Sequence, residues 1–293
     1  MPAFGARQFN DSETPASGPL TAVAAGRSLP MPGRDGPPHV VITGASSGIG
    51  AALARHYSTP GRRLTLIARD QIRLEAVAAA GRTLGARVDV HAADVTDAAA
   101  IERALMAADT EEPVALLIAN AGIGGRSSLA PASGEPGPVA REIFTTNALG
   151  VINTVAPLLP RFIDRRSGQI AIMSSLAGLV ALPACPAYSA SKAAILAYGT
   201  ALRRLAAPHG VHISVICPGF VDTPMSADLP FHRPFLWSAD RAARYVARAL
   251  ARGRREIVFP WPLALAVRTL GLLPAAMADR ILIRMANAGA LGD

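Results

Sequence analysis

Short apolar runs alternate with helical patterns along most of this chain, and this alternation limits the fold more than any other feature. Seven runs have the length and composition of strands: 40–43, 64–68, 87–92, 114–120, 169–174, 211–216 and 256–259. Helical patterns lie between them, at 48–59, 71–84, 97–108, 138–160, 187–207 and 239–252. The strand-like runs lack polar alternation, as parallel strands do when both faces of the sheet are buried. We therefore predict an α/β fold with one doubly wound, seven-stranded parallel sheet.

The chain divides into three parts. Residues 1–38 are rich in Pro, Gly, Ser and Ala without periodicity, so we expect a disordered N-terminal extension, with Met31 as an alternative translation start. Residues 39–260 contain the strand–helix alternation and predict a single folded domain. Residues 261–293 alternate apolar clusters with arginines and predict an amphipathic helical tail, with two short helices broken at Pro274.

Composition and charge exclude several classes of protein. Apolar residues make up 51% of the 293 residues and charged residues 17%, which supports a sizeable core. The net charge of +8 is spread along the chain without a long basic run, so we expect no nucleic-acid partner. The two cysteines and six histidines show neither a disulfide framework nor the spacing of metal ligands.

The terminus and the apolar stretches lead to an expectation about location. The N-terminus lacks the basic-then-apolar pattern of a signal peptide. No apolar stretch reaches about 18 residues, so we expect no membrane-spanning helix. Together with the low cysteine content, these features indicate a cytoplasmic protein.

A glycine-rich turn follows the first strand-like run, in the sequence VVITGASSGIG (40–50). Gly44, Ser46 and Gly48 satisfy G-x-S-x-G, the nucleophile elbow of α/β-hydrolases, with Ser46 as the nucleophile. Gly44, Gly48 and Gly50 also satisfy G-x-x-x-G-x-G, a variant of the turn that binds a dinucleotide pyrophosphate.

The position of this turn in the fold favours phosphate binding. A nucleophile elbow lies in mid-sheet and needs an oxyanion-hole donor from an earlier strand, whereas this turn follows the first strand. The acid and histidine partners that a Ser46 nucleophile needs are not evident, and His91 and His209 are only loose candidates. The helix N-terminus after the turn would offer free N–H groups and a positive dipole end to the phosphates. The predicted cradle consists of Gly44, Ser46, Ser47, Gly48, Ile49 and Gly50.

A second motif, YSASK (188–192), places Tyr188 and Lys192 four residues apart, on one face of a predicted helix. Lys192 is the only lysine of the chain, which otherwise uses arginine for positive charge. An ammonium is more compact than a guanidinium, and its pKa is more readily tuned. The pair therefore indicates a functional site, with a surface Tyr beside a surface Lys as the alternative.

Polar or glycine signals also follow the other predicted strands. Ser175 comes directly after the run 169–174. Asn147 lies inside an otherwise apolar helix, where asparagine is unfavourable unless its amide is used, and a buried capping or kink-forming role is the alternative. Ligands of open α/β sheets bind at the carboxyl ends of the strands. The remaining candidates at these ends are Asp94, Val95, Asn120, Ala121, Gly122, Pro218, Gly219, Val221 and Thr223.

Taken together, these motifs resemble the short-chain dehydrogenase/reductase family. TGASSGIG (43–50), NAG (120–122), Asn147, Ser175, YSASK (188–192) and PGFVDT (218–223) match the family's motifs in order and spacing. The resemblance covers about residues 39–260 and implies a Rossmann-fold catalytic domain that transfers a hydride between a nicotinamide and a carbonyl or secondary alcohol. One departure is Ala119, where the family often has an asparagine before Asn120.

The resemblance also implies a role for each catalytic residue. Tyr188 would be the general acid/base, and Lys192 would lower its pKa from about 10 and hold the nicotinamide ribose. Ser175 would stabilise the charge that develops on the substrate oxygen. Asn147 would hold a water that links Lys192 to solvent, and Thr223 would orient the carboxamide.

Residues at the end of the second predicted strand favour NADP over NAD. Ala68 occupies the place where an NAD-specific member carries an acidic residue. Arg69 follows about 20 residues after the glycine turn, where an arginine can bind a 2′-phosphate. Asp70 is the counter-argument, but we predict it to be the N-cap of the helix that begins at Gln71. We therefore predict NADP as cofactor, with NAD as the alternative and no metal.

Two regions beyond the motifs bear on substrate and partners. Phe231, Phe235 and Trp237 lie where the family places its substrate lid, so they suggest an apolar carbonyl or alcohol substrate, with packing of a surface loop as the equal alternative. The tail at 260–287 has three alternatives: it lies in a membrane interface, forms a subunit contact or covers the substrate cleft. The first would add a peripheral contact with the inner face of a membrane, and the family resemblance implies a homo-oligomer.

Two other functions are alternatives at this stage. A non-catalytic NADP-binding regulatory protein would keep the glycine turn without needing the four catalytic residues together. A serine hydrolase would use Ser46 as its nucleophile.

Overall fold

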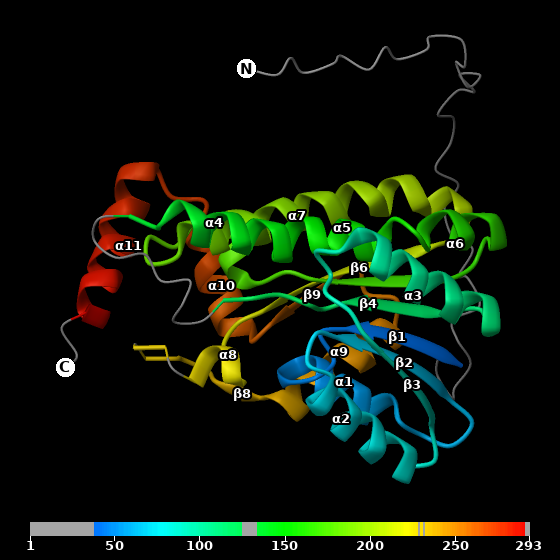
Figure 1. Ribbon diagram of the computed structural model, residues 1–293. Coiled ribbons are helices and arrows are strands. Elements are labelled where there is room, and N and C mark those ends of the chain that lie inside the picture. The colour runs from blue at the N-terminus through cyan, green and yellow to red at the C-terminus, as the bar shows by residue number, and fades with distance from the viewer. Residues whose placement is uncertain (1–37, 125–133, 228, 231, 291–293) are drawn as a thin grey trace, which may run out of the picture.

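The computed structural model describes residues 38–124, 134–227, 229–230 and 232–290. One seven-stranded parallel sheet has the order β3-β2-β1-β4-β5-β6-β9 (Figure 1). Because the chain proceeds outwards from β1 in both directions, the sheet is doubly wound, as predicted. Its strands are β1 (His39–Thr43), β2 (Arg63–Ala68), β3 (Arg87–Ala92), β4 (Leu116–Ala119), β5 (Gln169–Met173), β6 (His212–Pro218) and β9 (Glu256–Phe259). The predicted N-terminal extension lies outside the described residues, apart from residue 38.

Helices cover both faces of the sheet (Figure 1). One face carries α1 (Gly48–Tyr57), α2 (Gln71–Thr83) and α9 (Ala239–Ala251). The other carries α3 (Ala98–Glu111), α4 (Gly137–Phe144), a π-helical turn (Thr145–Leu149), α5 (Gly150–Val155), α6 (Leu159–Arg165) and α7 (Pro186–Ala206). Two 3-10 turns, Leu176–Gly178 and Ala207–His209, follow β5 and α7.

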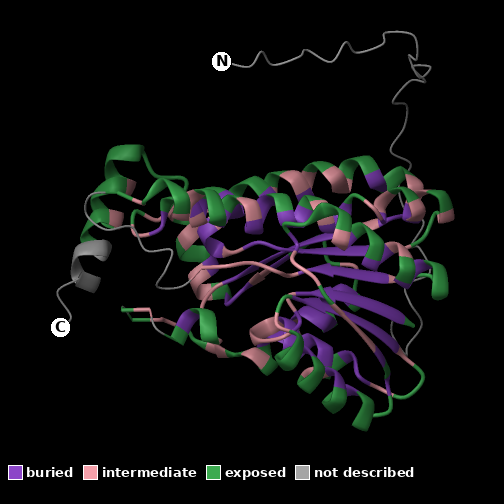
Figure 2. Cartoon of the chain, viewed as in Figure 1, coloured by how far each residue is buried: buried purple, intermediate pink, exposed green. Residues whose placement is uncertain are grey.

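Alternate strand residues divide the core into two layers. In β1, Val40 and Ile42 join the layer that also contains α1, α2 and α9, whereas Val41 joins the layer of α3, α5 and α7. All three side chains are fully buried, and Figure 2 shows the strands as a buried centre between half-exposed helices. Both faces of these strands are therefore covered, which explains their lack of polar alternation.

One helical run within the described residues, Gly137–Arg165, is long and apolar enough to cross a membrane by length and composition alone. From the sequence we expected no such segment. This run packs against α3 and α7, and 44% of its most apolar window is buried inside the protein. A core helix of a layered fold passes the same test, and we interpret the run as one.

The tail folds as two helices, α10 (Trp261–Leu270) and α11 (Ala275–Ala290), and the predicted break before residue 275 is confirmed. The segment between β6 and α9 is more regular than expected. Its short strands β7 (Val221–Asp222) and β8 (Trp237–Ser238) form a two-stranded parallel pair, and α8 (Pro224–Ala227) follows β7.

Candidate active site

The glycine-rich turn links β1 to α1 and forms one wall of the site. Gly44 has a φ of 67°, and a β-carbon at Gly50 would lie 2.2 Å from the Gly44 carbonyl oxygen, so no side chain fits there. Ser47 is the N-cap of α1, but its side chain makes no capping hydrogen bond. This hydroxyl and the N–H groups of the first helical turn suit a phosphate ligand.

Asn120, at the end of β4, holds this turn in place. Its Nδ2 donates hydrogen bonds to the carbonyl oxygens of Thr43, at 3.0 Å, and Gly44, at 3.2 Å. The Asn120 N–H donates to Thr43 Oγ1 at 3.1 Å. Asn120 thus links the end of β4 to the turn after β1, and the preceding Ala119 does not disturb these hydrogen bonds.

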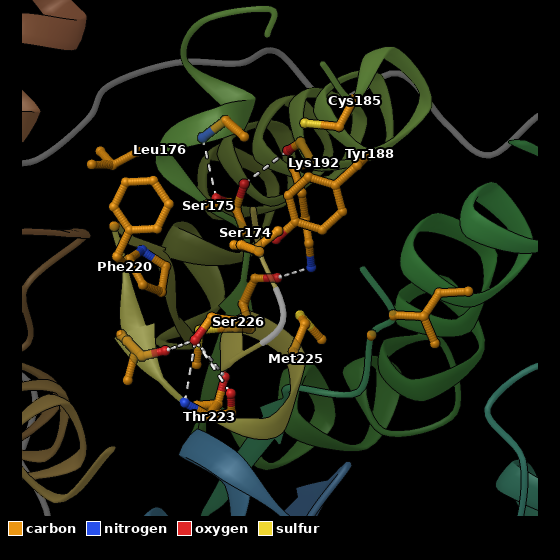
Figure 3. A pocket seen from close by; sticks show the side chains of 18 of the residues that line it. Ser174, Ser175, Leu176, Cys185, Tyr188, Lys192, Phe220, Thr223, Met225 and Ser226 are labelled. Carbon is orange, nitrogen blue, oxygen red and sulfur yellow. Dashed lines mark hydrogen bonds between the residues drawn. The ribbon is translucent and has the colours of Figure 1, made fainter. Parts of the chain in front are cut away.

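Thr223 approaches the glycine turn from the opposite side of the cavity. A β-carbon at Gly48 would lie 3.1 Å from Thr223 Cγ2, so the first and last motifs of the sequence meet here. Ser226 stabilises this segment, because its hydroxyl donates to the Val221 carbonyl at 2.6 Å and accepts from the Thr223 N–H at 3.3 Å (Figure 3).

Tyr188 and Lys192 project from α7 toward Ser175 at the end of β5 (Figure 3). Lys192 Nζ lies 5.7 Å from the centroid of the Tyr188 ring and donates to the Met173 carbonyl at 3.1 Å. Ser175 lies close enough to Tyr188 to lower its pKa, and Ser175 Oγ accepts a hydrogen bond from the Ala177 N–H at 3.1 Å. The structure thus brings together the three predicted catalytic side chains that face the cavity.

Burial has the largest effect on the pKa values of Tyr188 and Lys192. Burial raises the pKa of Tyr188 to about 12, although Ser175 acts in the opposite direction. Burial also lowers the pKa of Lys192 to about 8. The expected lowering of the Tyr188 pKa by Lys192 is therefore not met, because desolvation has the larger effect. The phenol is protonated at neutral pH, as a general acid requires.

Asn147 lies in the π-helical turn and is fully buried. Its Oδ1 accepts from the Ile123 N–H at 2.8 Å, and its Nδ2 donates to the Ile123 carbonyl at 3.0 Å and to Ser191 Oγ at 3.2 Å. The Asn147 amide therefore fixes the backbone after Gly122. This buried structural role is of the kind given as the alternative for Asn147 in the sequence. Its expected part in a water relay stays a prediction.

The other predicted residues meet in one cavity of about 2190 Å³. Apart from Gly50 and Asn147, every predicted site residue lines it: Gly44, Ser46, Ser47, Gly48, Ile49, Arg69, Asp94, Val95, Asn120, Ala121, Gly122, Ser175, Tyr188, Lys192, Pro218, Gly219, Val221 and Thr223. Gly50 does not line the cavity, but its lack of a side chain allows α1 to lie close to the end of β1. Sequence reasoning missed Gly124 and Met225, which lie beside the Tyr188 ring and carry no motif signal.

The end of β2 is arranged as the prediction requires. Asp70 is the N-cap of α2, because its Oδ1 accepts from the Arg73 N–H at 3.0 Å, and its Oδ2 accepts from Arg73 Nε at 2.6 Å. These hydrogen bonds lower the pKa of Asp70, the backbone one most. Arg69 Nη1 lies 3.6 Å from the Asp94 carboxylate. Arg73 also lines the cavity, and its spacing of four from Arg69 is a signal that sequence reasoning missed.

The aromatic residues of the segment 224–237 do not form the substrate wall. Trp237 stacks on Phe259 with ring centroids 4.9 Å apart, and Phe235 is 55% exposed. Neither lines the cavity, so the alternative of loop packing holds for these two residues, and Phe231 lies outside the described residues. Apolar side chains of α10 and α11 line the cavity instead, which favours the third alternative for the tail, a cover over the substrate cleft.

Gly124 gives a direct test of how Tyr188 is positioned. A β-carbon at Gly124 would lie 2.9 Å from Tyr188 Cε2, so Gly124→Ala must displace the ring. We expect kcat to fall at least about tenfold, the equivalent of about 1.4 kcal/mol, with cofactor affinity unchanged. Gly137→Ala is the matched control, because its β-carbon would meet only Arg141 at 3.5 Å. Equal kcat values for the two variants would contradict this role.

Comparison with known proteins places the chain in a family. The short chain dehydrogenase family model matches residues 38–233. An uncharacterized oxidoreductase of Myxococcus xanthus is 35% identical over 240 residues, which cover 82% of this chain and 94% of that protein. The chain belongs to the short-chain dehydrogenase/reductase family.

Solved structures agree with this assignment. A short-chain dehydrogenase from Sphingobium yanoikuyae in complex with NADPH is 29% identical, with a TM-score of 0.69, over 84% of this chain and 95% of that one. A short-chain dehydrogenase/reductase from Burkholderia phymatum in complex with NAD is 26% identical, with a TM-score of 0.71, over 78% and 91%. The protein is therefore an oxidoreductase that acts on CH–OH or C=O groups with a nicotinamide cofactor, and the hydrolase and regulatory alternatives are set aside.

Proposed function

We propose that this chain is an NADP(H)-dependent oxidoreductase that interconverts a carbonyl compound and a secondary alcohol, with Tyr188 as general acid/base. The arrangement at the end of β2 carries the choice of cofactor. Asp70 is engaged by Arg73 as a helix cap, and Ala68 has no carboxylate to bind a ribose 2′-OH. Arg69 and Arg73 both line the cavity, where their positive charge favours a 2′-phosphate.

The residues of the cavity fit such a cofactor along its length. The glycine-rich turn and the Ser47 hydroxyl suit the pyrophosphate, and Arg69 suits the adenosine 2′-phosphate. Lys192 would hold the nicotinamide ribose, and Thr223 would orient the carboxamide. When bound, the dihydronicotinamide supplies the hydride that reduces the carbonyl carbon.

The catalytic side chains provide what the carbonyl oxygen needs. Ser175 would donate a hydrogen bond to this oxygen and stabilise negative charge as it develops. Tyr188 would then give the oxygen its proton, which is consistent with a phenol that burial keeps protonated. In the oxidative direction Tyr188 would take the proton back. Lys192 favours the phenolate while it carries its own proton.

The cofactor preference is tested by calorimetric titration with NADPH and, separately, NADH. We expect NADPH to bind more tightly, and Arg69→Ala to weaken NADPH roughly tenfold or more, because a charged hydrogen bond is lost. Binding of NADH serves as the internal control and should change less than twofold. Tighter binding of NADH by the unmodified protein would reverse the proposed preference.

A further inference from the structure

The cavity extends well past the catalytic side chains, to the two helices of the tail. Its volume of about 2190 Å³ is roughly twice the upper limit typical of a site for one small molecule, about 1000 Å³. A cofactor and a large second molecule would both fit. The lining on the tail side comes from Leu263, Val267, Leu270, Leu273, Ile281 and Leu282.

The helix α10 is fixed on the sheet with one apolar face toward the cavity. Ala264 is buried in a cluster with Leu176, and Leu263 packs against this cluster. Leu263, Val267 and Leu270 recur at the spacing of one helical face. Because Leu176 follows the predicted oxyanion donor Ser175, the start of this face adjoins the reacting centre.

Met225 continues the apolar lining on the side of Tyr188. A β-carbon at Gly124 would lie 3.4 Å from Met225 Sδ and 2.9 Å from Tyr188 Cε2, so both side chains border Gly124. Methionine fills irregular gaps and adapts to ligands of different shape. An apolar group attached to the reacting carbon would therefore meet Met225 first.

Charged groups are confined to the other end of the cavity. Within the described lining, the Asp, Lys and Arg side chains are Arg69, Asp70, Arg73, Asp94 and Lys192, all at the cofactor positions or in the catalytic group, and His232 is the one histidine. The lining from α10 and α11 contains no ionisable side chain. A charged or strongly polar substituent would lose its hydration there without a compensating partner.

We propose that the substrate carries a long, uncharged apolar arm, which lies between Met225 and the inner faces of α10 and α11. This inference deepens the proposed function and rests on it. The arm would be held by burial of its apolar surface, and the carbonyl or hydroxyl group would be placed against Tyr188 and Ser175. Leu270 and Ile281 are then the residues that determine how long an arm the site accepts.

A series of linear 2-alkanones tests the proposal on the full chain with NADPH. We expect kcat/KM to rise roughly a hundredfold or more from 2-butanone to 2-dodecanone, since each buried methylene contributes severalfold. Leu270→Trp and Ile281→Trp would fill the space that the arm occupies. Each should lower the ratio of kcat/KM for 2-dodecanone to kcat/KM for 2-butanone at least tenfold. Leu272→Trp is the matched control, because Leu272 is 85% exposed and does not line the cavity.

A binding measurement separates this inference from the proposed function. Displacement of the uncharged fluorophore N-phenyl-1-naphthylamine by the same ketones reports the apolar chamber without turnover. Tighter displacement by 2-dodecanone than by 2-butanone, weakened by Leu270→Trp but not by Leu272→Trp, would support the arm even if neither ketone is reduced. The proposed arm would be overturned if the two ketones bound with equal affinity or if the fluorophore did not bind. It would also be overturned if Leu270→Trp and Leu272→Trp changed the affinity equally. Failure of NADPH to bind would instead contradict the proposed function.

Discussion

Tyr188→Phe is expected to abolish nearly all turnover while the cofactor still binds. The substitution removes one hydroxyl of the cavity wall, which is the proposed proton donor. A positioned general acid contributes a factor of about 100 to 10,000, so we expect kcat/KM to fall roughly a thousandfold. The measurement is NADPH oxidation at a fixed carbonyl concentration, together with a calorimetric Kd for NADPH that stays within about twofold.

Ser175→Ala and the double variant show whether the two hydroxyls act together. If Tyr188 and Ser175 hold the same oxygen, the double variant should lose little more activity than Tyr188→Phe alone, because residues that act as a unit are not additive. Fully additive losses would place Ser175 outside the reacting centre. Retained turnover in Tyr188→Phe would mean that another group supplies the proton.

The sheet and the cofactor edge follow from local patterns and are therefore predictable from sequence. Short, continuous apolar runs between helical patterns predict which residues form parallel strands, and those strands bring their carboxyl ends to one edge. Asp70 illustrates how local chemistry settles an ambiguous residue. Its position directly before the helix that begins at Gln71 predicts a helix cap, and the hydrogen bond that it accepts from the Arg73 N–H confirms it.

The properties that depend on burial by distant segments could not be predicted. The raised pKa of Tyr188 reflects how completely the surrounding segments exclude water, which no spacing in YSASK encodes. The side chain of Asn147 turns to Ile123, which lies on a different segment of the chain. Trp237 has the composition of a substrate lid but packs on Phe259, because β8 pairs with β7 and turns the indole away from the cavity.

The tail shows a similar limit. An amphipathic helix presents the same sequence pattern whether its apolar face meets a membrane, a second subunit or the protein's own cleft. Only the placement of Ala264 against Leu176 shows that α10 belongs to the wall of the cavity. Contact of the remaining exposed tail surface with a membrane, the homo-oligomeric state and the cytoplasmic location stay predictions.

We expect Lys192→Arg to lower activity nearly as much as a substitution that removes the positive charge of Lys192. Lys192 is only 4% exposed, and its Nζ donates to Met173 and would lie 3.3 Å from a β-carbon at Gly122. A planar guanidinium is larger than an ammonium, so it cannot occupy this position without moving its surroundings. We expect kcat/KM to fall roughly a hundredfold or more. Arg203→Lys, the reverse exchange on the same helix and outside the cavity lining, should stay within about twofold.

The pH dependence of carbonyl reduction identifies the charge that matters. Burial lowers the pKa of Lys192 to about 8, so the ammonium is present below this pH and is lost as the pH rises through it. Tyr188, with a pKa raised to about 12, remains protonated over the same range. We therefore expect kcat/KM for reduction to be level near pH 6 to 7 and to decline above about 8.

The residual activity of Lys192→Arg completes this test. A guanidinium does not titrate in this range, so its profile should lack the decline near pH 8. A decline that persists unchanged in Lys192→Arg would assign it to another group. If the activity of the unmodified protein instead rises above pH 8 in the reductive direction, the ammonium hinders proton donation, and the proposed role of Lys192 fails. The two profiles thus separate a requirement for positive charge from a requirement for a small cation at this buried position.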